Sequence, residues 1–96
     1  MLIIAGYLTV DADRRDAFVD AHRDLVQRAR QMPGCLDLAI TADPIDPARV
    51  NNFERWESRE KLTEWRQIAN APDAGIAIRS DQVMEYTVTG ERPPFD

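Results

Sequence analysis

Four stretches of the chain carry apolar residues in the period-two arrangement that is typical of β-strands. The first stretch is residues 2–10, where both faces carry mostly apolar side chains, so neither face is expected to meet water. In the second stretch, Leu36, Leu38 and Ile40 are expected to share one face. The four predicted strands cover residues 2–10, 35–41, 49–57 and 82–89.

Helical spacing of apolar residues separates the first two strands and the last two. The first predicted helix begins at the aspartates that follow residue 10, and Pro33-Gly34 ends it. Ser58 is a favourable N-cap for the second helix, which stops at Asn70-Ala71-Pro72-Asp73. The connection 74–80 is ambiguous, with a short helical turn as one option.

Two helices interleaved with four strands, in the order β-α-β-β-α-β, predict an α+β fold of the ferredoxin-like, split β-α-β type. Two helices can cover only one face of such a four-stranded antiparallel sheet. Because the strands are apolar on both faces, the uncovered face needs a partner, and a second copy of the same sheet is the simplest one. We therefore predict a single domain over residues 1–96, with its core at 2–90 and a C-terminal tail at 91–96, that acts as a homodimer.

Composition narrows the possible partners. Twelve basic and seventeen acidic side chains give a net charge of -5 without a basic stripe, which argues against a nucleic-acid partner. Cys35 is the only cysteine, so an intrachain disulfide and a zinc site built on several thiolates are excluded. The absence of an apolar run of about 20 residues argues against a membrane partner, and without a signal-like segment a cytoplasmic location is expected.

The predicted strand 49–57 carries the most informative polar side chains. Asn52, Glu54 and Trp56 share one face of it, because side chains alternate along a strand. Asn52 and Trp56 can offer an amide and an indole N–H to a ligand, or they can simply pack. Glu54 can accept a proton if burial raises its pKa, or it can form an ion pair with Arg55, Arg79 or another arginine.

Other candidate residues are distributed over the remaining elements. His22, the only histidine, lies with Phe18 on the apolar stripe of the first helix, where it can serve as a general base or as a core residue. Tyr7 and Tyr86 lie on strands and can donate their phenol groups to a ligand or pack. Cys35 follows a helix-ending turn with no evident base beside it, which favours a small buried hydrophobe. Metal-ligand spacings and phosphate-binding loops are not found in the sequence.

Three segments together give the chain a family likeness. They are Arg30-Gln31-Met32-Pro33-Gly34-Cys35-Leu36, Asn52-Phe53-Glu54-Arg55-Trp56-Glu57-Ser58 and Glu85-Tyr86-Thr87-Val88-Thr89-Gly90. Through them, residues 2–90 resemble the antibiotic biosynthesis monooxygenase family. The resemblance implies a dimeric α+β barrel in which two sheets pack together and each subunit holds a pocket between its sheet and its helices.

The resemblance also implies a cofactor-independent monooxygenase that oxidises a small aromatic, phenolic or quinol-type substrate with dioxygen, without metal or flavin. Loss of an acidic proton turns the substrate into the electron donor, while the protein orients and stabilises the anion. Family members use an asparagine and a tryptophan four residues later, which Asn52 and Trp56 match. With His22, these are the predicted catalytic residues. The predicted substrate-binding residues are Tyr7, Phe18, Glu54, Leu62, Trp65 and Tyr86.

Two alternatives remain open at this point. The first is a non-catalytic dimeric barrel that binds a small apolar ligand. A residue able to accept a proton beside Trp56, either His22 or a buried Glu54, would favour the enzyme. The second alternative is a haem-degrading enzyme. That branch of the family uses a histidine in the second helical region, where this chain has none.

Overall fold

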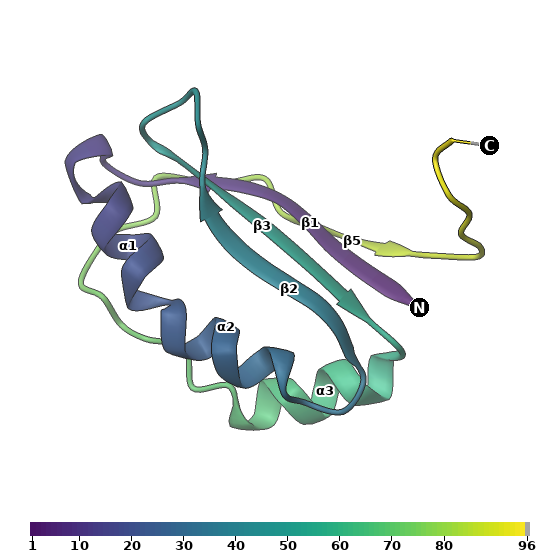
Figure 1. Cartoon of the computed structure of the whole chain (residues 1–96). Helices are drawn as coiled ribbons and strands as arrows, with labels where there is room; N and C mark the ends of the chain where they lie inside the picture. The colour runs from purple at the N-terminus through teal and green to yellow at the C-terminus, as the bar shows by residue number, and fades with distance from the viewer. Residues whose placement is uncertain (96) are drawn as a thin grey trace.

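One antiparallel sheet with all helices on the same side organises the chain (Figure 1). The structure is a computed structural model that describes residues 1–95, so Asp96, the end of the predicted tail, lies outside the described residues. The elements, in chain order, are β1 (Leu2–Thr9), a 3-10 turn η1 (Ala12–Arg14), α1 (Arg15–Ala21), α2 (Arg23–Arg30), β2 (Cys35–Ala42), β3 (Arg49–Trp56), α3 (Arg59–Ile68), β4 (Ser80–Asp81) and β5 (Met84–Thr87).

The sheet has the strand order β2-β3-β1-β4, and β5 pairs with β1 beside β4. All pairings are antiparallel, and the sheet is open, with β2 at one edge and the β4–β5 segment at the other. This arrangement confirms the predicted α+β, ferredoxin-like fold with helices on one face. The tail beyond β5 leaves the body of the molecule as an extended segment (Figure 1).

The last predicted strand, residues 82–89, is wrong in its bounds: only Met84–Thr87 within it form a strand, β5, and Gln82 and Val83 divide β5 from the short strand β4 (Ser80–Asp81) that precedes the predicted range. Gly6 of β1 lies at the division with φ +147°, and a Cβ atom there would come within 2.1 Å of the Gln82 carbonyl oxygen. The N–H of Gln82 donates to the Tyr7 carbonyl at 2.8 Å. The backbones therefore approach closely at Gln82 and Val83, where the strand is interrupted.

The core lies between the helix-facing side of the sheet and the helices. Trp56 on β3 is fully buried, and its ring stacks on that of Trp65 from α3, with 6.3 Å between ring centroids. The inner face predicted for the second helix is confirmed, since Leu62 and Trp65 are both buried. Ser58 caps this helix, as predicted, by accepting a hydrogen bond from the Lys61 N–H. The main buried cluster is Leu2, Ile4, Leu25, Ala29, Leu38, Trp56, Leu62 and Trp65.

The first predicted helix is divided at His22 into α1 and α2. In an unbroken α-helix, the His22 N–H would donate to the Phe18 carbonyl. Here the imidazole Nδ1 lies 2.8 Å from that carbonyl, and the backbone N–H turns to Val19 instead. The side chain therefore competes with the backbone for the Phe18 oxygen, and the helix breaks at this residue.

The predicted faces of β2 are correct except at Leu36. Leu38 and Ile40 face the helices, but the register of β2 against β3 shifts between Cys35 and Asp37. This irregularity turns Leu36 away from the core and leaves it 46% exposed, while Cys35 packs against the main buried cluster. A bulge inserts an extra residue and so changes the face on which the preceding residues lie.

Candidate functional site

Asn52, Glu54 and Trp56 lie together on the helix-facing side of β3. The Glu54 carboxylate accepts hydrogen bonds from the Asn52 amide at 3.3 Å and from the Trp56 indole N–H at 3.1 Å. The three side chains thus form one hydrogen-bonded chain along the strand. The single indole N–H of Trp56 has Glu54 as its acceptor, so a ligand could use it only if it changed partner, whereas the Asn52 amide keeps a second N–H and its carbonyl oxygen.

The ion pair considered for Glu54 is not formed with either named arginine. Arg79 pairs with Asp11 at 3.0 Å, and Arg55 approaches Glu91 at 3.9 Å. Arg55 lies on the opposite face of β3 from Glu54, as the alternation along the strand requires. The Glu54 carboxylate is instead held by neutral donors of its own strand.

Cys35 lies near this hydrogen-bonded chain but does not act as an activated thiol. Burial, followed by the negative charges of Glu54 and Asp37, raises the pKa of the Cys35 thiol above its usual value. The thiol is therefore protonated at neutral pH, which is the unreactive form. Its half-buried side chain packs against the core.

His22 lies at the junction of α1 and α2, half-buried against Phe18, with 4.4 Å between the two rings. A carbonyl oxygen can only accept, so the ring Nδ1 that approaches the Phe18 oxygen carries the hydrogen. In the neutral imidazole, Nε2 is then left with a free lone pair. The geometry consequently gives His22 the tautomer that a general base needs, at a position away from the hydrogen-bonded chain of β3.

The remaining predicted site residues are divided between the core and the outer face of the sheet. Phe18, Leu62 and Trp65 are buried core residues. Tyr7 and Tyr86 lie on the face of the sheet away from the helices, and the Arg49 guanidinium covers the Tyr7 ring at 3.9 Å. The sheet therefore separates the two tyrosines from Asn52, Glu54 and Trp56.

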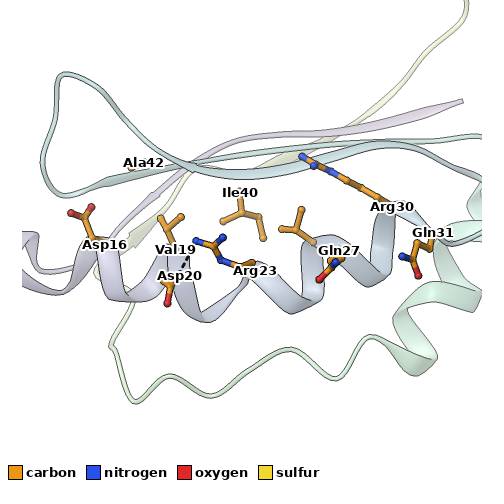
Figure 2. Close-up of a pocket in the computed structure, with 10 residues that line it drawn as sticks. Asp16, Val19, Asp20, Arg23, Gln27, Arg30, Gln31, Ile40 and Ala42 are labelled. Atoms are coloured by element: carbon orange, nitrogen blue, oxygen red, sulfur yellow. Dashed lines mark hydrogen bonds and ion pairs between the residues drawn. The ribbon is translucent and has the colours of Figure 1, made fainter.

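A cavity of about 700 Å³ opens between the α1–α2 pair and the edge strand β2 (Figure 2). Its apolar wall comes from valines of the helices together with Ile40 and Ala42 of β2, and polar side chains form its rim. Ile40 is the cross-strand partner of Asn52, so the cavity reaches the sheet one strand away from the hydrogen-bonded chain. The lining residues are Asp16, Val19, Asp20, Arg23, Val26, Gln27, Arg30, Gln31, Ile40 and Ala42.

None of the predicted site residues is among these ten. The polar lining residues on α1 and α2 occupy positions typical of the solvent-exposed side of an amphipathic helix. The hydrophobic pattern alone therefore predicts that they face solvent rather than a cavity. One feature of the sequence does indicate an apolar surface on this side of the helices: Val19 and Val26 lie seven residues apart on the same flank. Both valines are half-buried, and they form the helical part of the cavity wall.

Metal binding and membrane crossing find no support in the part of the chain that the structure describes. Residues 1–95 hold no group of three or more histidine, cysteine, aspartate or glutamate side chains placed to bind a metal ion. No helix within these residues is long and apolar enough to span a membrane. The expected cytoplasmic location stays a prediction.

Comparison with known proteins places these features in a family. The family model described as "Antibiotic biosynthesis monooxygenase" matches residues 1–71. A curated relative, the uncharacterized protein sll1783 of Synechocystis, is 25% identical over 61 residues, which are 64% of this chain and 42% of that protein. The matched region thus spans less than half the length of that relative.

Solved structures show the same fold. A candidate antibiotic biosynthesis monooxygenase from Deinococcus radiodurans superimposes with a TM-score of 0.83 at 19% identity, covering 100% of this chain and 99% of that one. A second candidate from Chloroflexus aurantiacus is 26% identical, with a TM-score of 0.73 and 96% of each chain covered. The family likeness read from the sequence is confirmed by the family match and by these structures.

Proposed function

The chain belongs to the antibiotic biosynthesis monooxygenase family, and from that premise we propose that it is a cofactor-independent monooxygenase that oxidises a small aromatic, phenolic or quinol-type substrate with dioxygen. The observation that carries this proposal is the cavity of about 700 Å³ between the helices and the sheet. Its volume lies within the range of about 300–1,000 Å³ that small-molecule pockets occupy. The apolar wall formed by Val26 and Ile40 suits the flat body of an aromatic ring.

For an anthrone-type substrate, the proposed reaction balances without any cofactor. A base removes a proton from the activated CH₂ group, and the resulting anion transfers electrons to dioxygen. One oxygen atom remains on the substrate as a carbonyl, and the other leaves as water with the two hydrogens of the CH₂ group. The protein supplies the base, the orientation and the stabilisation of the anion.

Glu54 is the base that we propose, because it is the carboxylate nearest in sheet register to the wall residue Ile40 and because two donors fix its position. Access from the cavity requires a movement of the side chains over β3. His22, with its free Nε2, is the alternative base. In this proposal, the role of Asn52 and Trp56, which match the asparagine and tryptophan of the family, is to hold the Glu54 carboxylate in position.

One observation favours a second candidate function, a non-catalytic protein that binds a small apolar ligand. The three residues predicted to be catalytic, His22, Asn52 and Trp56, do not line the cavity. The two carboxylates that do line it, Asp16 and Asp20, are paired with Arg15 and Arg23, so a ligand bound there would meet no unpaired carboxylate unless the side chains rearranged. The two functions differ in a single measurable property, the consumption of oxygen.

Oxygen consumption by the purified protein, measured with a panel of anthrones, naphthols and quinols, tests the proposal. We expect turnover of at least one compound, and a decrease in kcat of about 10²–10⁴-fold in Glu54→Gln if Glu54 is the base. Glu57→Gln is the matched control, because Glu57 is an exposed glutamate just beyond β3. Saturable binding without oxygen consumption would favour the second candidate function. A decrease in kcat in His22→Ala but not in Glu54→Gln would identify His22 as the base.

The face of the sheet away from the helices supports a second proposal, a homodimer. Cross-strand pairing places Phe53 beside Ala5 and Ala5 beside Met84, with the pair Ile3 and Tyr86 in the next row. Phe53, Met84 and Tyr86 are 36%, 61% and 52% exposed, so a contiguous apolar patch faces solvent in the single chain. In the same face, the Nε of Arg55 is buried without a hydrogen-bond partner among the described residues. A second copy would cover the patch and could supply that acceptor.

A further inference from the structure

Arg30 differs from the other charged side chains that line the cavity. Asp16 pairs with Arg15 at 2.8 Å, and Asp20 pairs with Arg23 at 3.0 Å. Each carboxylate of the cavity is thereby balanced by an arginine, and among residues 1–95 Arg30 forms no ion pair. The guanidinium of Arg30 is thus the unbalanced charge of the cavity, and it is positive.

The position of this guanidinium is fixed by the backbone. Its Nε donates to the Leu38 carbonyl of the edge strand β2 at 2.8 Å. Figure 2 shows the side chain lying along β2 with its nitrogen atoms turned toward Ile40. The structure gives neither Nη group a hydrogen-bond partner among the described residues. An arginine held in this way presents a fixed pair of donors, which is the geometry that recognises a carboxylate or an ionised phenol.

We propose that the cavity binds its ligand as an anion, with a negatively charged oxygen on the Nη groups of Arg30 and an apolar ring against Val26 and Ile40. The ligand class is an aromatic acid, in which a carboxylate or an acidic phenol is attached to a ring. Where this ligand is the substrate, the inference rests on the proposed monooxygenase function. Binding as an anion then assists that reaction, because Arg30 stabilises the negative charge before dioxygen reacts.

The overall charge of the chain makes a local cation necessary for such a ligand. The net charge is -5, so the protein repels an anion at long range. Removal of an anion from water requires a charged or hydrogen-bonding partner at the binding site. Arg23, the other arginine of the cavity, is already paired with Asp20. Arg30 is therefore the group of the cavity best placed to receive the anionic oxygen.

Isothermal titration of the purified protein with 2-naphthoate and with its neutral analogue 2-naphthamide tests the inference without any turnover. The two probes have the same ring, and they differ in charge at the substituent. We expect 2-naphthoate to bind roughly 10- to 100-fold more tightly, since a hydrogen bond to a charged group contributes more than a neutral one. Equal affinities, or no saturable binding of either probe, would overturn the inference, and this comparison needs no variant.

Arg30→Gln should reduce the affinity for 2-naphthoate to that for 2-naphthamide, and Arg30→Lys should retain part of the preference. Arg66→Gln is the matched control, because Arg66 is an exposed arginine on α3 that does not line the cavity. Far-UV circular dichroism and thermal unfolding check the fold of Arg30→Gln, which loses the bond to Leu38. An equal loss of affinity in Arg66→Gln would show a general charge effect and overturn the inference.

The two proposals fail in different ways. A preference for 2-naphthoate that depends on Arg30, together with no oxygen consumption by any compound, would refute the monooxygenase function and leave the anion site intact. Turnover of a neutral aromatic compound that is unaffected by Arg30→Gln would refute the anion site and leave the monooxygenase function intact.

Discussion

At Gly6 the backbone of β1 approaches the backbone of Gln82 too closely for any side chain. A Cβ at this position would lie 2.1 Å from the Gln82 carbonyl oxygen, and the φ of +147° is one that L-residues rarely adopt. A strained backbone and an overpacked contact each cost about 1–3 kcal/mol. We expect Gly6→Ala to lower the free energy of unfolding by roughly 3 kcal/mol or more, measured by urea denaturation at fixed protein concentration.

Two other glycines separate the contributions to this effect. Gly75 has φ +67° but open space around it, so Gly75→Ala should cost only about 1–2 kcal/mol, the strain of a left-handed residue. Gly90 has open space and no positive φ, and Gly90→Ala should change stability by less than about 0.5 kcal/mol. Similar losses in all three variants would contradict the role assigned to the Gln82 contact.

Asp43 holds the turn between β2 and β3. Its carboxylate accepts hydrogen bonds from the N–H of Asp46 at 2.8 Å, the Asn51 amide at 2.9 Å and the N–H of Ile45 at 3.0 Å. The hydrogen bond from Asp46, followed by those from Asn51 and Ile45, lowers the pKa of Asp43 from 3.8 to about 2. The turn is also tied to α1, because Arg15 donates to the Asp43 and Asp46 carbonyls.

The pKa of Asp43 predicts a pH dependence of stability with a definite sign. Because the folded-state pKa is below the unfolded value, the ionised carboxylate stabilises the fold fully above pH 3.8, and this stabilisation is lost as the pH falls through about 2. Asp43→Asn should thus be less stable than the wild type at pH 6. Urea denaturation at a series of pH values should show the difference shrinking between pH 4 and pH 2, and a constant difference would contradict the prediction.

At the scale of single residues, the sequence predicted correctly which side chains share a strand face, but it did not predict their hydrogen-bond and ion-pair partners. Asn52, Glu54 and Trp56 share a face because alternation is a local property of a strand. That Glu54 would bond to its two neighbours, while Arg55 turned to Glu91, depends on side-chain rotamers and on the tail beyond β5. Those determinants lie outside any local pattern.

At the scale of elements, the break at His22 yields a prediction that also supports the functional test. His22→Ala removes the ring that occupies the Phe18 carbonyl, so the N–H of residue 22 can donate there and join α1 to α2. The lost ring contact with Phe18 opposes the gain in helix propensity from alanine. We expect a change in stability within about 1 kcal/mol and an undiminished helical signal in far-UV circular dichroism.

This outcome would allow a decrease in turnover by His22→Ala to be assigned to lost chemistry rather than to a lost fold. A loss of helical signal, or a destabilisation of more than about 2 kcal/mol, would instead make His22 a structural residue of the helix pair.

The elements themselves were largely predictable, and the deviations have identifiable physical causes. Period-two and helical patterns located three of the strands and the inner face of α3, since each depends on residues close in the chain. The register shift before Asp37, the division after Gln82 and the break at His22 each depend on a single contact. The cavity depends on how far the helices stand from β2, which no sequence pattern encodes.

At the scale of the whole molecule, the apolar patch of Phe53, Met84 and Tyr86 predicts self-association. A stable interface buries about 1,600 Å² in total, or about 800 Å² for each partner, and one face of this sheet is the natural place for it. We expect the wild-type protein to sediment with twice the mass of the 10.9 kDa chain at micromolar concentration.

Phe53→Glu places a charge next to Ala5 in the centre of the patch, and it should sediment as a monomer because burying an unpaired carboxylate is unfavourable. The matched control is Ile68→Glu, since Ile68 is 57% exposed on α3, on the helix side of the sheet, and this variant should remain dimeric. A wild-type protein that sediments as a monomer, or a dimer that Phe53→Glu leaves intact while Ile68→Glu dissociates it, would place the association surface elsewhere or remove it. Dissociation by Phe53→Glu alone would identify the outer face of the sheet as the surface through which two copies associate.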